Sequence, residues 1–181
     1  MSSISISARA RRLDTPILRG NLVELSTICY PAQRRLKKIT SNKGSQLNAV
    51  LAIGQILFAL IFINSGISHL TKLDAMTGYA KYKKVPAAKL SVIVSGLMIL
   101  VGGIFVALGI YADLGALLIA LFLIPTAFMM HNFWKETDPT AKMNETIGFF
   151  KDLSLAGAAL IIYALVAGGA ELGINITGSF F

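Results

Sequence analysis

Four long runs of apolar residues are the feature of this sequence that most limits its fold. Each run is a continuous block, without the alternation of a half-buried strand or the polar face of a surface helix. Runs of about 18 or more apolar residues indicate helices that cross a lipid bilayer. Only 14% of all residues are charged, and these fall mainly outside the four runs. We therefore predict an all-α fold, an integral membrane four-helix bundle with spans at about 47–68, 90–110, 113–130 and 147–169.

A basic segment precedes the first span. Nine of the 17 Lys and Arg residues lie before residue 47, where the only acids are Asp14 and Glu24. This Ser- and Arg-rich, acid-poor composition is typical of an organellar transit peptide, and it equally fits a basic arm that lies on lipid or on a partner protein. Both interpretations stay open for residues 1–46. A four-transmembrane-helix domain at 47–170 and a short tail at 171–181 are predicted to follow.

The charge and the single cysteine restrict the partners and cofactors. The net charge is +8, and basic residues clustered beside a span favour contact with anionic lipid headgroups. No nucleic acid partner is expected, because no aromatic residues are interleaved with the bases as a stacking platform would require. Cys29 alone cannot form an intramolecular disulfide or a cysteine-built zinc or iron–sulfur site. We predict contacts with membrane lipids and with other subunits of a membrane protein complex.

The connections between the spans determine which chain ends share a membrane surface. Only residues 111–113 separate the second span from the third, so these two helices must form an antiparallel hairpin. In the longer connections, we expect Asp74 to cap a short interfacial helix rich in Tyr and Lys, and Asn144 to cap the last helix. The first and third spans then end on the surface where the second and fourth begin. The bases in the loops do not decide which side of the membrane that surface faces.

This shared surface collects the side chains that could perform chemistry. Both histidines and the only tryptophan of the chain belong to it. Ionisable groups at the edge of a membrane bundle are candidates for function, because burying a charge there is costly. The predicted face for quinone, lipid or a partner consists of His69, Lys72, His131, Asn132, Trp134 and Lys151.

Four interpretations of this face stay open. It could bind a quinone headgroup, where His or Lys donates to a carbonyl oxygen and protons are exchanged. Ligation of haem or a metal would require both imidazoles to face inward, so haem is disfavoured and no metal site is predicted. The face could instead dock a protein, or its long side chains could simply reach the headgroup region. We assign no catalytic residue; the candidates for handling protons are His69, His131, Lys151 and Asp152.

Five stretches of the sequence carry a family resemblance, which covers about residues 50–168. They are residues 65–71, the Lys84-Val85-Pro86 entry to the second span, the Gly102-Gly103 pair, residues 126–128 leading to His131-Asn132-Phe133-Trp134, and residues 149–153. The last two match in order and spacing as well as in type, and together the five resemble the DoxX family of four-helix membrane proteins.

Two positions depart from the pattern of that family. Many relatives have Lys where His69 stands, and an acidic residue just before the paired glycines. In this chain residues 97–101, which precede the glycines, are wholly apolar. If this acidic side chain takes part in a reaction in relatives, this chain lacks the group that does so.

The resemblance implies a redox setting. The family takes its name from a subunit associated with a thiosulfate:quinone oxidoreductase, and other members are linked to redox complexes in bacterial membranes. We expect an accessory or structural subunit of a membrane redox or respiratory complex, with quinone as candidate cofactor. Its location would be a mitochondrial inner membrane or a bacterial plasma membrane.

Two other functions remain as alternatives. The first is a small quinone-linked oxidoreductase component, so whether the protein is an enzyme stays open, although an accessory role is favoured. The second is a small-solute transporter, which is disfavoured because the second span offers only Ser91 and Ser95 as polar lining.

Overall fold

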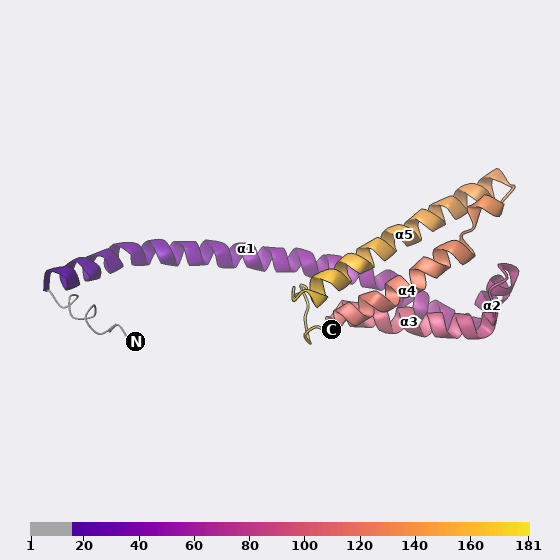
Figure 1. The fold of residues 1–181 in the computed structure, drawn as a ribbon, viewed down its shortest axis with the longest axis horizontal. Helices are drawn as coiled ribbons and strands as arrows, with labels where there is room; N and C mark the ends of the chain where they lie inside the picture. The colour runs from indigo at the N-terminus through magenta and orange to yellow at the C-terminus, as the bar shows by residue number, and fades with distance from the viewer. Residues whose placement is uncertain (1–15) are drawn as a thin grey trace, which may run out of the picture. The chain divides into compact units, whose positions relative to one another are not determined.

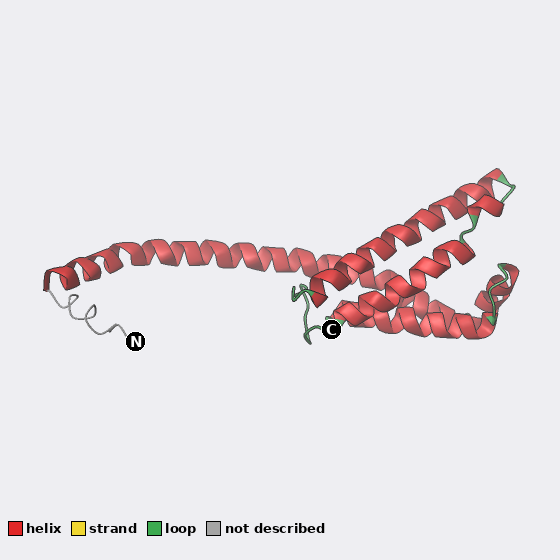
Figure 2. Ribbon diagram, in the orientation of Figure 1, coloured by secondary structure: helices red, strands yellow, loops and turns green. Residues whose placement is uncertain are grey.

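A computed structural model of the chain describes residues 16–181, and the side chains of residues 44–181. The boundary between its two compact units, Met1–Gln46 and Leu47–Phe181, lies inside the first helix. The transit-peptide and basic-arm interpretations of residues 1–46 depend on side chains outside the described residues. The elements, in order, are α1 (Pro16–Thr71), α2 (Leu73–Tyr82), α3 (Ala88–Leu108), α4 (Ala112–Met130), the short 3-10 helix η3 (Phe133–Lys135) and α5 (Pro139–Ala167) (Figures 1 and 2).

Within the described part, four helical segments are long and apolar enough to cross a membrane: Gly44–Thr71, Ala88–Leu108, Ala112–Lys135 and Pro139–Ala167. Large apolar side chains on these helices, such as Leu57 and Ile161, are more than half exposed. The buried positions where helices meet include many alanines. In lipid, an exposed Leu has no penalty, and small residues let helices approach closely. The predicted all-α, four-helix membrane fold is therefore confirmed.

The paired glycines of α3 allow α1 and α4 to cross this helix at close range. A Cβ on Gly102 would lie 2.8 Å from the carbonyl oxygen of Gly115 on α4, and a Cβ on Gly103 would lie 2.9 Å from Cγ1 of Ile63 on α1. One glycine on each side of α3 thus allows the close approach of both neighbours, and a larger residue would push a helix away. Beyond this crossing, α3 and α4 diverge toward the end where α2 and η3 lie (Figure 1).

Two predicted helix caps are wrong. The last helix begins at Pro139 rather than after Asn144, because the Asp138 side chain accepts a hydrogen bond from the backbone N–H of Ala141 at 2.7 Å and Pro139 suits the first helical position. In α2, Lys72 occupies the cap position without a side-chain hydrogen bond. Asp74 lies inside the first turn, where its charge still favours the positive end of the helix dipole.

The residues after α5 close the opposite end of the bundle, at the α3–α4 turn. Nε2 of Gln55 donates to the carbonyl oxygens of Val106 at 2.6 Å and Ile174 at 2.8 Å, and its Oε1 accepts from the Ile174 N–H at 2.9 Å. The fully buried Asp113 accepts hydrogen bonds from residues 179–181 at 2.7 to 3.0 Å. Specific hydrogen bonds therefore hold this end of the bundle together. At the diverging end, the helices are connected by the polar residues described next.

Candidate functional site

A cavity of about 630 Å³ lies at the diverging end of the bundle, bordered by α2, α3, α4 and the last turn of α1. The volume falls in the range of about 300–1,000 Å³ that is typical of small-molecule sites. Its walls are mostly apolar and include four methionines, whose unbranched, flexible side chains adapt to the shape of a ligand. The polar side chains on the lining are His69, Tyr79, Ser91, Ser95, Thr126 and His131.

His69 reaches the cavity from the last turn of α1. Its Nδ1 lies 2.8 Å from the carbonyl oxygen of Ser65, one turn earlier on the same helix. Its ring stands edge-on to Phe122 of α4, with 6.1 Å between the ring centroids. The backbone of α3 passes close by at Gly96, where an added Cβ would lie only 2.7 Å from Cβ of His69. The imidazole is thus half-buried and fixed between three helices.

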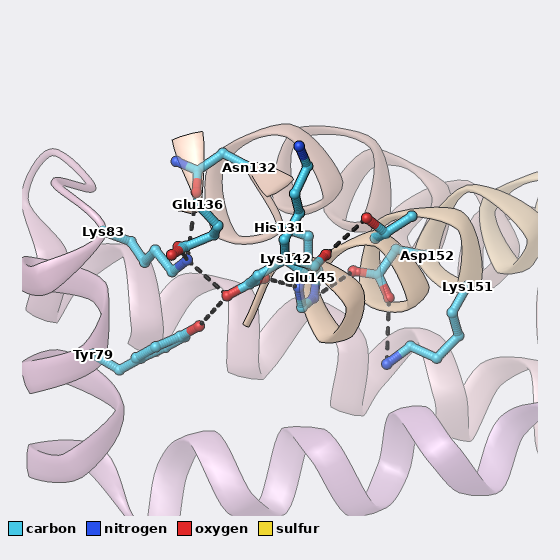
Figure 3. Close-up of polar contacts among 10 residues, drawn as sticks. Tyr79, Lys83, His131, Asn132, Glu136, Lys142, Glu145, Lys151 and Asp152 are labelled. Atoms are coloured by element: carbon cyan, nitrogen blue, oxygen red, sulfur yellow. Dashed lines mark hydrogen bonds and ion pairs between the residues drawn. The ribbon is translucent and has the colours of Figure 1, made fainter. Parts of the chain in front are cut away.

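His131 follows α4 and lies between two carboxylates of α5. Its Nδ1 is 2.8 Å from Oε2 of Glu145, and its Nε2 is 3.5 Å from Oδ2 of Asp152 (Figure 3). Gly148 leaves room for the ring, because a Cβ there would lie 2.5 Å from Nδ1 of His131. A carboxylate only accepts hydrogen bonds, so the 2.8 Å contact with Glu145 assigns a hydrogen to Nδ1 of the ring.

Lys83 joins this group from the segment that follows α2. Its Nζ lies 2.8 Å from Oε1 of Glu145, 3.4 Å from Oδ1 of Asn132 and 3.5 Å from Oε1 of Glu136. Its side chain is only 5% exposed. The Tyr79 hydroxyl, from α2, donates to the same Glu145 oxygen at 3.4 Å (Figure 3). We call the connected residues the ion network: Tyr79, Lys83, His131, Asn132, Glu136, Glu145, Lys151 and Asp152.

The environment shifts the pKa values of Tyr79 and Lys83, which lie between the first two spans. Burial raises the pKa of Tyr79 above its ordinary value of 10.0, and the charge of Glu145 raises it further. Burial by itself would lower the pKa of Lys83, but its hydrogen bond to Glu145 and the nearby charges outweigh that effect, and the pKa lies above the ordinary 10.5. At neutral pH Lys83 is therefore a cation and Tyr79 a neutral hydroxyl.

The structure brings together some of the residues predicted for the functional face. His131, Asn132 and Asp152 belong to the ion network, and Lys151 reaches its edge, with Nζ 3.8 Å from Oδ1 of Asp152 and a half-exposed side chain. His69 shares the cavity with His131 but hydrogen-bonds its own helix.

Two predicted residues lie apart from the ion network. Lys72 is exposed at the start of α2. Trp134 is half exposed and packs against Phe128, Phe133 and Phe149, with ring centroids 5.2 to 6.5 Å away. Its role in the structure is therefore that of an aromatic contact between η3 and the adjacent ends of α4 and α5.

The sequence prediction missed Tyr79, Lys83, Glu136 and Glu145 as members of the site. Tyr79 and Lys83 belong to the stretch that was expected to form an interfacial helix rich in Tyr and Lys, yet Lys83 is turned inward to Glu145. A signal was present, because the topology that groups the histidines also places both long connections on the same surface. One connection is rich in Lys and the other contains Glu136, Asp138 and Glu145, so opposite charges face each other there.

The two imidazoles do not fit a bis-histidine haem site. Both nitrogens of His131 face carboxylates, so neither is free to ligate iron without breaking the ion network. In the part of the chain that the structure describes, no group of three or more His, Cys, Asp or Glu side chains could hold a metal ion.

Four apolar membrane-crossing helices with charged residues gathered at one end define a small polytopic integral membrane protein. Residues 50–132 match the DoxX family model, in agreement with the resemblance seen in the sequence. It is 29% identical over 127 residues to the inner membrane protein YphA of Escherichia coli (strain K12), an alignment that covers 70% of this chain and 89% of that relative. No solved structure is significantly similar to the chain.

Proposed function

We propose that the protein is an accessory subunit of a membrane redox or respiratory complex, and that its cavity binds a lipid-soluble molecule of the quinone class. The observation that carries the proposal is the cavity of about 630 Å³, with apolar walls and the polar groups of His69 and Tyr79 on its lining. A quinone likewise combines apolar and polar parts, because it has an apolar tail and a head ring that bears two oxygen atoms. The diverging helices would admit the tail from the lipid.

The family resemblance supports the redox setting, and the relative in Escherichia coli supports the kind of membrane. The DoxX family is linked to a quinone-dependent oxidoreductase through the subunit that gave it its name. The relative in Escherichia coli is an inner membrane protein, which supports a bacterial plasma membrane. The Ser- and Arg-rich composition of residues 1–46 supports a mitochondrial inner membrane. We place the proposed complex in one of these two membranes.

An accessory role is favoured over catalysis because the ion network satisfies its own charges. Lys83 contacts three acceptors, and His131 lies between two carboxylates. The alternative is a quinone-linked oxidoreductase component that would use His69, His131, Lys151 and Asp152 to handle protons during turnover. A small-solute transporter is supported least, because the mostly apolar lining gives a polar solute little to replace its hydration.

The binding part of the proposal is tested with the full chain in lipid nanodiscs. Retention of a radiolabelled decyl-benzoquinone is measured by equilibrium dialysis, and protein-free nanodiscs correct for partition into lipid. Ser95→Phe fills the cavity from α3, and the Ser95 hydroxyl bonds only its own helix at 3.2 Å, so little else is lost. Leu97→Phe, on the exposed face of the same helix, is the matched control.

We expect saturable binding by the wild type and by Leu97→Phe, and a loss of about tenfold or more in Ser95→Phe. Equal retention by all three proteins, at the level of empty nanodiscs, would show that the cavity takes no quinone.

The assembly part of the proposal is tested independently. The native protein is extracted in mild detergent, sized without denaturation, and its companions are identified by mass spectrometry. An accessory subunit should migrate in a larger assembly with redox or respiratory subunits. Migration alone or as a small homo-oligomer would contradict the accessory role, whatever the result for quinone binding.

A further inference from the structure

The hydrogen bond of His69 fixes which ring nitrogen carries the hydrogen. Nδ1 lies 2.8 Å from the carbonyl oxygen of Ser65, and a carbonyl oxygen can only accept. Nδ1 must therefore be the donor, and in the neutral ring Nε2 has a lone pair and no hydrogen. Among the described residues no hydrogen bond reaches Nε2, so the acceptor remains available at the wall of the cavity.

The hydroxyl groups on the lining direct their hydrogens elsewhere. Ser91 donates to the carbonyl oxygen of Pro86 at 2.7 Å, Ser95 to that of Val92 at 3.2 Å, and Thr126 to that of Phe122 at 2.7 Å. Each of these bonds lies within one stretch of chain and satisfies a backbone carbonyl. The oxygen atoms of these side chains can still accept a hydrogen bond, but their single hydrogens are engaged.

The remaining polar groups on the lining also point their donors away from the cavity. Tyr79 donates to Glu145, and the two nitrogens of His131 face Glu145 and Asp152. Within the described residues, the cavity therefore presents acceptors to a ligand and no uncommitted side-chain donor. A carbonyl oxygen on the ligand would lack a partner there, whereas a hydroxyl group would find one at Nε2 of His69.

From this asymmetry we infer that the cavity prefers the reduced, hydroxyl-bearing form of its ligand, a hydroquinone, which donates its O–H to Nε2 of His69. The inference rests on the proposed function, because it names the form of quinone that the same cavity holds. A buried polar group without a partner loses its hydrogen bond to water, so the oxidised form is bound more weakly. One net hydrogen bond corresponds to a preference of roughly two- to tenfold.

Other lipid-soluble alcohols share the chemistry of the hydroquinone hydroxyl. A long-chain alcohol or a monoacylglycerol could also donate to His69 from the lipid phase. The cavity volume of about 630 Å³ leaves room for a ring as well as a chain, so we assign the site to the hydroquinone. The experiment includes an alcohol so that binding of the hydroquinone can be distinguished from binding of other lipid-soluble alcohols.

The test compares the two redox forms on the full chain in nanodiscs under argon. Dissociation constants are measured for decyl-benzoquinone and for its hydroquinone, and decanol is titrated as a competitor. Three variants are used: His69→Leu removes the acceptor, His69→Gln keeps an amide oxygen that can accept, and Thr71→Val is the control. Thr71 lies two residues further on in α1, is exposed, and its hydroxyl bonds only the Ile67 carbonyl oxygen at 2.8 Å.

We expect the wild type and Thr71→Val to bind the hydroquinone roughly two- to tenfold more tightly than the quinone. His69→Leu should bind both forms equally, and His69→Gln should retain part of the preference. Equal binding of both forms by the wild type, or a preference that persists in His69→Leu, would overturn the inference. Decanol displacing the hydroquinone at equal affinity would overturn the assignment to a ring. Binding of neither form would instead contradict the proposed function.

A spectroscopic measurement distinguishes a direct contact from a structural effect of the mutation. The chain contains two histidines, so a sample labelled with ¹⁵N-histidine has only four ring-nitrogen signals. Hydroquinone should shift the Nε2 signal of His69 in the wild type while the signals of His131 stay in place. A shift at His131 with none at His69 would show that the ligand contacts the ion network instead.

Discussion

Lys83 and Glu145 lie 62 positions apart in the sequence, and their Nζ and Oε1 atoms are 2.8 Å apart. The contact joins the end of α2 to the beginning of α5. Both side chains are largely shielded, at 5% and 15% exposure, so solvent screens their attraction much less than it would at an open surface. Because α2 also lines the cavity, this pair holds the wall of the cavity in position.

Replacing Lys83 by Met should destabilise the protein strongly. The substitution leaves the Glu145 carboxylate largely buried without its closest cation, and removing one partner of a buried pair costs about 3–5 kcal/mol. Unfolding in mixed micelles of mild detergent and dodecyl sulfate would measure the loss. Lys81→Met, at an exposed position of α2, should stay within about 0.5 kcal/mol of the wild type. A double variant Lys83→Met/Glu145→Gln should recover part of the loss, because residue 145 then has no charge that lacks its closest cation.

The same residues predict how stability depends on pH. The pKa values of Lys83 and Tyr79 are raised above 10.5 and 10.0 in the folded protein, so both groups bind their protons more tightly when folded. Their stabilisation is complete below the ordinary values and is lost as pH rises through the folded-state values. The free energy of unfolding should therefore fall above about pH 10. The fall should be shallower in Lys83→Met, and a wild-type profile that is flat or rises there would contradict this account.

Gly148→Ala should displace His131. The added Cβ would lie 2.5 Å from Nδ1 of the ring, the atom that contacts Glu145, so the ring must shift. We expect a loss of about 1–3 kcal/mol in the free energy of unfolding, as for other overpacked sites. Gly157→Ala on the same helix meets nothing within 4 Å and should be neutral, or stabilising by up to about 1 kcal/mol. Equal effects of the two substitutions would mean that the position of His131 does not depend on Gly148.

At the other end of the bundle, Gln55→Leu should release the residues after α5. The variant loses three hydrogen bonds, including the one from the Ile174 N–H. Exchange of the Ile174 amide hydrogen should accelerate by about tenfold or more. Asn64→Leu, at an exposed position of α1, should leave this exchange unchanged. Hydrogen exchange measured by mass spectrometry on C-terminal peptides gives both values.

The four spans could be predicted because lipid imposes one simple condition, an apolar surface over the whole length of a helix. Residues 47–68 satisfy that condition whatever their neighbours are. The short turn at 111–113 then determines which helix ends share a surface. That is why the topology alone assigns His131 and Asp152 to one group.

The cavity and most of its polar neighbours could not be predicted in the same way. Asp138 and Asn144 are equally good cap residues, and only the adjacent Pro139 favours the first. Whether Lys83 faces lipid or Glu145 depends on the path of the chain after α2, which local composition does not determine. The tautomer of His69 depends on the distance to one carbonyl oxygen, that of Ser65.

Trp134 is the chain's single tryptophan, half exposed in the aromatic cluster beside His131. Indole emission shifts to longer wavelength as water reaches the ring, and no second tryptophan obscures it. The protein therefore contains its own optical reporter for hydration at this end of the bundle. Separation of η3 from α5 would appear as a colour change in the emission of the unlabelled protein.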